Sequence, residues 1–121
     1  MNPVMREYFR QKLLRWRSDL LLDSTETLQH LQEDNVSEAD LADRASTETD
    51  RSIELRTRDR ERKLIQKIDE ALRRIEENSY GFCEDTAEPI SIKRLEARPI
   101  ATLSLEAQER HERLERTQRE E

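Results

Sequence analysis

The sequence predicts a mainly α-helical protein built on a long antiparallel two-helix coiled-coil hairpin, followed by a small globular region and a C-terminal helix. Charged residues make up 41% of the 121 residues and hydrophobic residues only 33%, so the chain cannot fill a thick core. One Gly, three Pro and abundant Glu, Arg and Leu are typical of long helices with a narrow apolar stripe. Apolar residues recur at helical spacing in two long segments, which favours folded helices over a disordered chain.

The first helix is expected to begin at Asn2 and Pro3. Asn is a favoured N-cap, and Pro suits the first helical position because its missing N–H would be unpaired there anyway. From this point apolar residues recur at spacings of three and four: Met5, Phe9, Leu13, Trp16 and Leu20. After a polar patch at Asp23 and Ser24, Leu28 and Leu31 extend the stripe. The spacing predicts an amphipathic helix of about 30 residues, about 45 Å long.

The hairpin is assigned to residues 1–79, with a tip loop at about 33–49. Periodicity fails in that loop, where Asn, Ser and Asp favour turns over helix interiors. A second apolar stripe follows it: Ile53, Leu64, Ile68, Leu72 and Ile75. Gly81 comes just after the pattern stops and suits a left-handed C-terminal cap. Two such stripes are buried best against each other, as an antiparallel pair.

Residues 80–121 are expected to form the small globular region and the C-terminal helix. The first part of this segment is rich in apolar residues and proline: Tyr80, Phe82, Pro89, Ile90, Ile92, Leu95, Pro99 and Leu103. Ser104 is a suitable N-cap for the final helix, which is expected to run through Leu114.

Charge is unevenly distributed along the chain. Residues 1–18 carry +4, residues 19–50 carry −9 and residues 51–75 carry +4, within an overall charge of −6. The overall sign disfavours general nucleic-acid binding. A hairpin would collect the carboxylates of the middle segment at its tip. They could be no more than a solvated turn, or they could enter a cavity of a larger partner and act on a cation, an Arg or a mobile loop there.

A row of cations follows in the second helix. Arg60, Lys63 and Lys67 share one helical face, beside Leu64. Arg and Lys bind phosphate oxygens, and the apolar neighbour could support a base or sugar. The alternative is a solvated face that forms exposed ion pairs with Asp59 or Glu61.

Cys83 is the only cysteine, so the chain has neither an internal disulfide nor a Cys-x-x-Cys pair. We expect it to be a small apolar side chain, with a redox-sensing thiol as the less favoured alternative. His30 and His111 are isolated in sequence and are expected at the surface. No Ser-His-Asp or Cys-His arrangement is supported, so an enzyme is not expected.

No stretch of the sequence predicts a membrane segment. The longest apolar run spans residues 20–22, far below the roughly 20 residues that a span requires, and no signal-like stretch opens the chain. We expect a cytoplasmic monomer.

Four stretches resemble the DksA/TraR family. They are residues 43–45, 53–65, 80–83 and 94–99, and the ordered combination of ELRTRDRERKL with RLEARP is their most specific feature. The resemblance covers nearly the whole chain. It implies a bacterial transcription regulator whose hairpin enters the secondary channel of RNA polymerase without binding a specific DNA sequence. Such a protein acts with ppGpp to destabilise promoter complexes, as at ribosomal RNA promoters, and modulates initiation.

The resemblance also implies two sets of site residues. The first is a partner-binding tip that comprises Asp40, Asp43 and Ala45. The second is a ppGpp-binding set that comprises Arg60, Lys63, Leu64, Lys67 and Arg98. A further basic position of well-known relatives, in the final helix, is Gln108 here, so the expected affinity for ppGpp is lower.

The main departure from the family concerns zinc. Many members carry four cysteines in two Cys-x-x-Cys pairs, and the aligned positions here are Cys83, Thr86, Ser104 and Ala107. The chain thus resembles the cysteine-poor, zinc-independent branch, and its globular region is expected to be a degenerate zinc-finger-like unit. We expect ppGpp as effector, no zinc or other tightly bound cofactor, and packing by apolar side chains: Phe82, Ile90, Ile92, Leu95, Leu103 and Leu105.

Two alternative functions remain open. One is a secondary-channel factor for transcript cleavage or polymerase rescue, in which tip carboxylates position a metal ion. The other is a plain coiled-coil scaffold that does not bind polymerase.

Overall fold

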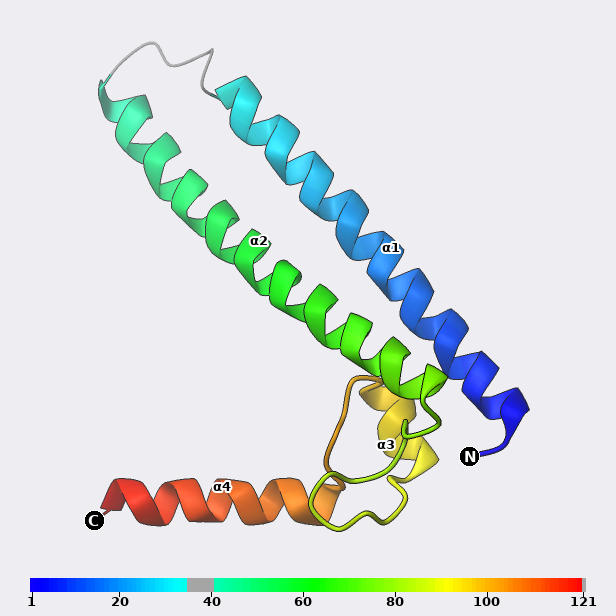
Figure 1. The fold of residues 1–121 in the computed structure, drawn as a ribbon. Helices are drawn as coiled ribbons and strands as arrows, with labels where there is room; N and C mark the ends of the chain where they lie inside the picture. Colours follow the sequence, from blue (N-terminus) through cyan, green and yellow to red (C-terminus); the bar gives the residue numbers. More distant parts are fainter. Residues whose placement is uncertain (35–40, 121) are drawn as a thin grey trace. The chain divides into compact units, whose positions relative to one another are not determined.

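The computed structural model describes the backbone of residues 1–34 and 41–120 and the side chains of residues 1–23 and 47–118. Within the described backbone there are four helices: α1 (Pro3–Asp34), α2 (Leu41–Glu76), α3 (Ile92–Ala97) and α4 (Leu105–Glu120) (Figure 1). The extended pairing among the described residues is an isolated bridge between Phe82 and Pro89. The predicted mainly α fold class is therefore confirmed. None of the described helices combines the length and apolar character that crossing a membrane requires.

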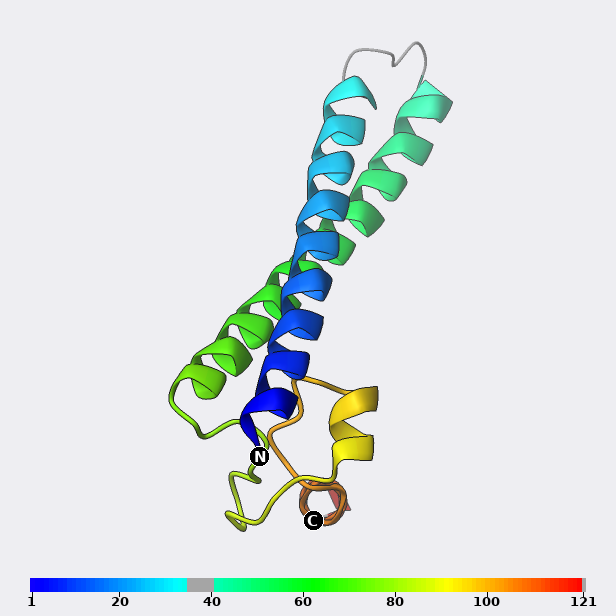
Figure 2. The ribbon, with the colours of Figure 1, turned by 90° about the vertical axis from the view of Figure 1, so that its right-hand side faces the viewer.

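The chain divides into two compact units. The hairpin unit comprises Leu14–Asp69, and the globular unit comprises Met1–Leu13 together with Glu70–Glu121. In the hairpin unit, α1 and α2 run antiparallel, as Figure 1 and Figure 2 show from two sides. The predicted antiparallel helix pair is present there.

The first helix begins as the sequence predicts. The side-chain oxygen Oδ1 of Asn2 accepts a hydrogen bond from the backbone N–H of Met5 at 2.8 Å, and α1 starts at Pro3. This N-cap satisfies one of the amide groups that the first turn of a helix leaves unpaired.

The predicted tip loop is too long. The first helix continues to Asp34 and α2 begins at Leu41, so residues 41–49 are helical. Asp43 was interpreted as a turn former, but it lies in the first turn of α2, where an acidic group interacts favourably with the positive end of the helix dipole. Residues 35–40 lie outside the described residues.

The seam of α2 is apolar in its second half and charged in its first half. Ile68 is fully buried and Ile65 half-buried, whereas Ile53, predicted to lie in the apolar stripe, is 55% exposed. Half-buried positions recur here at spacings of three and four and continue the heptad pattern: Arg51, Glu54, Arg58 and Glu61. The apolar stripe was wrongly extended to Ile53 because the repeat carries charges, not apolar residues, in this half.

The second helix ends without using Gly81. Asn78 adopts the left-handed conformation with φ 63°, and the carbonyl oxygen of Arg74 accepts hydrogen bonds from the N–H groups of Ser79 and Tyr80. Asn tolerates this conformation better than most residues, so the predicted glycine cap is corrected to Asn78. Gly81 has φ +90° in the following turn, where an added Cβ would lie 2.8 Å from Cε of Met1. Its lack of a side chain allows this close approach.

The globular unit has a small core built from both ends of the chain. Its buried apolar side chains are Phe9, Leu13, Ala71, Ile75, Tyr80, Cys83, Ile90, Leu95, Ile100, Ala101 and Ala107. Of the predicted packing residues, Ile90 and Leu95 are buried. Phe82, Ile92 and Leu105 are exposed, so they were wrongly assigned to the core.

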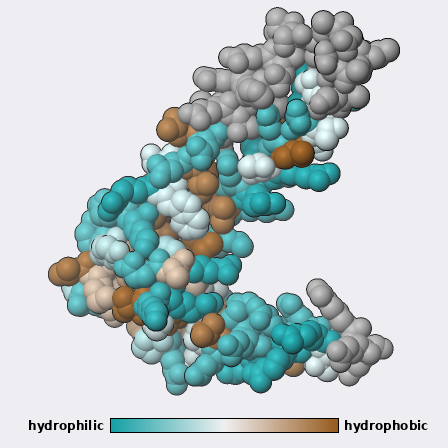
Figure 3. Space-filling model, turned by 180° about the vertical axis from the view of Figure 1, so that it is seen from behind, coloured by the Kyte–Doolittle hydropathy of each residue, from teal (hydrophilic) through white to brown (hydrophobic). Residues whose placement is uncertain are grey.

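Serine caps begin α3 and α4. The Oγ of Ser91 accepts from the N–H of Arg94 at 3.2 Å, and the Oγ of Ser104 accepts from the N–H of Ala107 at 3.2 Å. The prediction that Ser104 caps the final helix is confirmed. The surface seen in Figure 3 is mainly hydrophilic, with apolar side chains scattered among the polar ones, as the composition leads one to expect.

Candidate functional site

The predicted tip falls mostly beyond the described side chains. Asp40 lies outside the described residues. The backbone of Asp43 and Ala45 belongs to the beginning of α2, and their side chains lie outside the described ones. The partner-binding role of these three residues therefore stays a prediction, now on a helix start and not in a long loop.

The cationic row lies on α2 in the hairpin unit. Arg60, Lys63 and Lys67 are exposed and Leu64 is half-buried. At about 1.5 Å per residue, the row extends about 10 Å along the helix axis. The carboxylate of Asp59 pairs with Arg62, which lies outside the row, at 3.5 Å. Four of the five predicted ppGpp residues therefore share one helix, and three of these are exposed cations.

The fifth predicted residue, Arg98, belongs to the globular unit. It is exposed and forms the C-cap of α3, where its backbone N–H donates to the carbonyl oxygen of Arg94 at 2.8 Å. Pro99 follows directly, and a residue before proline is disfavoured in the α-helical region. The helix therefore ends here, and Arg98 takes φ −143° and ψ 84°.

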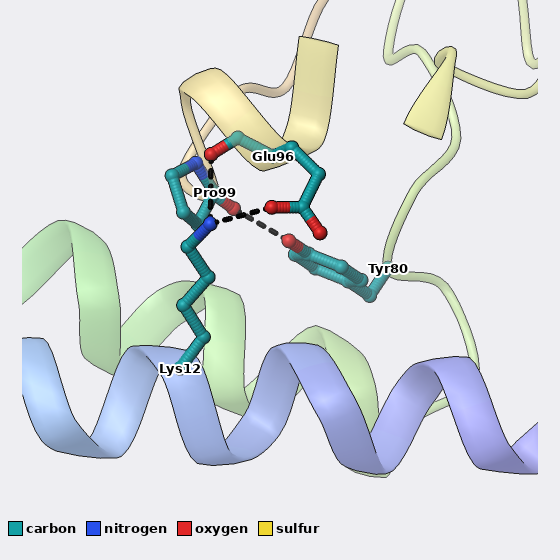
Figure 4. A network of polar contacts seen from close by, with 4 residues as sticks. All are labelled: Lys12, Tyr80, Glu96 and Pro99. Carbon is teal, nitrogen blue, oxygen red and sulfur yellow. Dashed lines mark hydrogen bonds and ion pairs between the residues drawn. The ribbon is translucent and has the colours of Figure 1, made fainter. Parts of the chain in front are cut away.

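Polar contacts hold the backbone on both sides of Arg98 (Figure 4). The Nζ of Lys12 donates to the backbone oxygen of Glu96 at 2.9 Å and to its carboxylate at 2.8 Å. The hydroxyl of Tyr80 donates to the carbonyl oxygen of Pro99 at 2.7 Å in a buried environment. These contacts could not be predicted from the sequence, because Lys12 and Glu96 are 84 residues apart and no local pattern indicates that they meet.

Titration shifts accompany both contacts. Burial raises the pKa of Tyr80 well above its usual value, with Glu96 adding to the rise and Arg74 opposing it. Tyr80 therefore stays a neutral hydrogen-bond donor at physiological pH. Hydrogen bonds from Lys12 and then Tyr8 lower the pKa of Glu96 below its ordinary 4.5. Glu96 is therefore a carboxylate at the same pH.

A hollow of about 390 Å³ opens beside Arg98. Its lining combines cationic and apolar groups: Ser91, Lys93, Arg94, Ala97, Arg98 and Leu105. Within it, the Nε of Arg94 donates to the carbonyl oxygen of Leu103 at 2.8 Å, which holds that side chain in place. Lys93 was not singled out in the sequence, because it precedes the RLEARP motif, and Arg94 was noted only as the first residue of that motif, with no role assigned to it.

The aligned zinc-finger positions meet in the globular unit. Cys83 is buried, with a free thiol. Burial opposes its ionisation, but hydrogen bonds from the side chains and backbones of Thr86 and Ser104 together lower its pKa to about 6. Ala107 is buried and its N–H binds Ser104. The structure therefore gathers one thiol, two hydroxyls and one methyl where four thiols would form a metal site, and the redox role of Cys83 stays a prediction.

Among the isolated histidines, His111 has a partner that the sequence did not reveal. Its Nε2 lies 2.6 Å from Oδ2 of Asp85, and both side chains are exposed. This contact joins α4 to the loop that follows Cys83, 26 residues earlier in the chain.

Comparison with known proteins gives consistent matches. Residues 5–75 match the model of the N-terminal domain of DnaK suppressor protein DksA, and residues 78–113 match the prokaryotic dksA/traR C4-type zinc finger. An RNA polymerase-binding transcription factor DksA from Caulobacter vibrioides is 64% identical over 99% of this chain and 84% of its own length. The protein of the same name from Escherichia coli K12 is 42% identical over 88% of this chain and 70% of its own length.

A solved structure is similar as well. Transcription factor DksA2 from Pseudomonas aeruginosa superposes with a TM-score of 0.89 at 44% identity, over 96% of this chain and 89% of that one.

The zinc-finger match corrects one prediction. We expected no zinc, but residues 78–113 match a C4-type zinc finger, a class of domain that binds this metal, so that expectation is contradicted. The residues of this chain nevertheless do not supply a four-cysteine set, since Cys83 is its one cysteine. Among the described residues, no group of three or more His, Cys, Asp or Glu side chains could hold a metal ion. The donors present thus depart from those of the matched class.

The first family match, over residues 5–75, contains the whole hairpin unit and also parts of the globular unit, and the second, over residues 78–113, lies within the globular unit. The two models together match residues from 5 to 113, and the identity to named relatives extends over almost the full chain. The chain belongs to the DksA/TraR family.

Proposed function

We propose that this chain binds RNA polymerase and regulates transcription initiation, without enzymatic activity of its own. The observation that carries the proposal is the 64% identity, over 99% of the chain, to a protein named RNA polymerase-binding transcription factor. Such a partner implies a bacterial cytoplasm as the place of action. It also requires no sequence-specific DNA contact, which is compatible with the net charge of −6.

The hairpin of residues 1–79 is the part proposed to enter the secondary channel of the polymerase. At about 1.5 Å per residue, a helix as long as α2 extends about 54 Å, enough to carry its first turns deep into a large partner. Asp40, Asp43 and Ala45 would then act near the active centre. The proposed role of residues 80–121 is to hold the outer part of the protein against the polymerase surface.

The proposed effector is ppGpp, bound where the protein meets the polymerase. Exposed Arg60, Lys63 and Lys67 in the hairpin unit offer guanidinium and ammonium donors for phosphate oxygens, and exposed Arg98 in the globular unit offers a guanidinium of its own. Leu64 provides an apolar contact. Gln108 cannot supply a charge at the remaining position, and its side-chain amide donates to Glu112 at 3.3 Å. An affinity lower than that of relatives with a basic residue there is the expected consequence.

Regulation follows from differential binding. A factor that binds one state of a promoter complex more tightly than another shifts the population toward the first state, by no more than the difference in its two affinities. If the hairpin favours a polymerase state in which the promoter complex is unstable, complexes that are already short-lived dissociate. Binding of ppGpp at the same interface strengthens the effect by linkage.

The test is transcription from a ribosomal RNA promoter by purified polymerase, with and without the protein and ppGpp. The expected result is inhibition by the protein, increased by ppGpp and weakened by Asp43→Asn. Unchanged transcription and no polymerase binding would reject the proposal in favour of a plain scaffold. Cleavage of transcripts in stalled complexes that is lost on Asp43→Asn would favour the cleavage or rescue function.

A further inference from the structure

The segment that presents Arg98 has little stability of its own. The helix α3 contains six residues, far fewer than the about 12–15 at which isolated helices become even marginal in water. Beyond Arg98 the proline ends the helix, and a turn hydrogen bond from the N–H of Ala101 to the carbonyl oxygen of Arg98 at 3.0 Å holds the backbone there. These local bonds leave the segment short, so the direction of the Arg98 side chain also depends on the contacts that its flanking residues make with distant parts of the chain.

On the N-terminal side the contact comes from Lys12. Its ammonium group binds both the backbone oxygen and the carboxylate of Glu96, two residues before Arg98. The carbonyl groups of the last helical turn lack intrahelical partners and carry the negative end of the helix dipole, so a cation is favourable there. Tyr8 adds a hydrogen bond to the same carboxylate. One side chain thus fixes the end of α3 to α1.

On the C-terminal side the contact comes from Tyr80. Its hydroxyl donates to the carbonyl oxygen of Pro99, the residue directly after Arg98, at 2.7 Å. The ring is almost fully buried and lies against Phe9, with ring centroids 5.8 Å apart. Because the ring is held in the core, the hydroxyl is a fixed reference point for the backbone.

We propose that Lys12, Tyr80 and Glu96 form a clamp that fixes the backbone on both sides of Arg98 and thereby sets the response of the protein to ppGpp (Figure 4). This inference rests on the proposed ppGpp role of Arg98. The three clamp members are positioning residues: they bind the chain that carries Arg98, and the ligand is bound by Arg98 itself. A clamped Arg98 loses less conformational freedom when it binds a phosphate than an unclamped one.

The main experiment uses Tyr80→Phe in the full-length protein, with purified polymerase and a ribosomal RNA promoter. This substitution keeps the buried ring and removes only the hydroxyl that binds Pro99. The concentration of ppGpp for half-maximal inhibition is expected to rise about fivefold, the change that corresponds to a typical buried hydrogen bond. Inhibition without ppGpp should be unchanged, because the tip of the hairpin is not altered.

The matched control is Ile75→Val, which removes one methyl group from the core of the same unit and lies outside the clamp. It should lower the melting temperature at least as much as Tyr80→Phe without changing the ppGpp response. A second pair tests the ammonium contact: Lys12→Met should weaken the response, and Lys12→Arg should restore most of it because it keeps a cationic donor. An equal loss of the ppGpp response in Tyr80→Phe and Ile75→Val would mean that the loss comes from lower stability of the folded unit, and it would overturn the proposal.

Arg98→Ala separates the clamp from the function on which it rests. If Arg98→Ala leaves the ppGpp response intact, the proposed role of Arg98 is wrong and the clamp falls with it. If Arg98→Ala weakens the response and Tyr80→Phe does not, the clamp alone is overturned. The clamp predicts that Tyr80→Phe has no further effect on the ppGpp response once Arg98 is Ala, since the two residues then act as one unit.

Discussion

A matched pair of substitutions in α2 tests where its apolar seam ends. Ile68 is fully buried and Ile53 is 55% exposed, although both belong to the hairpin unit and both were predicted to lie in the stripe. Changing each of them to Ala removes the same three carbon atoms from the same helix. The two variants therefore differ in burial and not in chemistry.

The expected cost is much larger at the buried position. Three carbon atoms at about 0.8 kcal/mol each contribute about 2.4 kcal/mol of transfer free energy at Ile68. The cavity left behind raises this to about 3–4 kcal/mol, inside the range of about 2–5 kcal/mol for such changes. At Ile53 the smaller loss of burial is offset by the better helix propensity of Ala, so a change within about 0.5 kcal/mol is expected.

Urea unfolding followed by far-ultraviolet circular dichroism measures both values. With an m-value of about 1.5 kcal/mol per M, Ile68→Ala should lower the midpoint by roughly 2 M and Ile53→Ala by less than about 0.4 M. Equal losses at the two positions would mean that Ile53 is a seam residue. The assignment of the seam positions in this half of α2 to Arg51, Glu54, Arg58 and Glu61 would then be wrong.

Three further predictions follow from single contacts. Lys67→Ala should weaken the ppGpp-dependent part of inhibition in the transcription assay while changing the free energy of unfolding by less than about 0.5 kcal/mol, because exposed cations contribute little to stability; a normal ppGpp response would remove Lys67 from the site. Asn78→Ala should destabilise the chain by about 1–2 kcal/mol in urea, because Asn78 has φ 63°, whereas Asn78→Gly should be nearly neutral; the reverse order would contradict the cap. The pKa of Glu96 lies below 4.5, so its carboxylate stabilises the folded chain above that pH and this stabilisation is lost as the pH falls through the lowered pKa. The difference in melting temperature between the wild type and Glu96→Gln should therefore shrink as the pH falls below 4.5, and a constant difference would contradict the contact.

Local features of the fold were readable from the sequence. The caps at Asn2 and Ser104 were predicted and are present, because an N-cap depends only on a side chain and the amides that follow it within three residues. The buried positions Phe9, Leu13 and Ile68 were predicted from helical spacing alone. These features depend on residues that lie close together in the sequence, so they can be predicted from it.

The charged half of the α2 seam could not be predicted in the same way. Apolar periodicity does not reveal this half, because its half-buried positions keep the spacing of three and four but carry charged residues: Arg51, Glu54, Arg58 and Glu61. Arg51, Glu54 and Glu61 each interact with other groups, so none of them is a free charge in the seam. The signal that identifies these positions is the heptad spacing itself, irrespective of polarity.

The surroundings of Arg98 could not be predicted at all. Its place in a site followed from family resemblance, but the contacts of Lys12 and Tyr80 depend on how distant parts of the chain pack.

The prediction that the chain binds no zinc failed for a different reason. It counted thiol ligands, whereas the match over residues 78–113 reflects the whole pattern of the domain, which persists in a chain with Cys83 alone.

The lifetime of a ribosomal promoter complex formed by purified RNA polymerase tests the proposed function most directly. Addition of the protein should shorten this lifetime, and ppGpp should shorten it further in the wild type but not in Arg98→Ala. An unchanged lifetime at protein concentrations well above that of the polymerase, together with no detectable binding to the enzyme, would contradict the proposal that this chain regulates transcription through RNA polymerase.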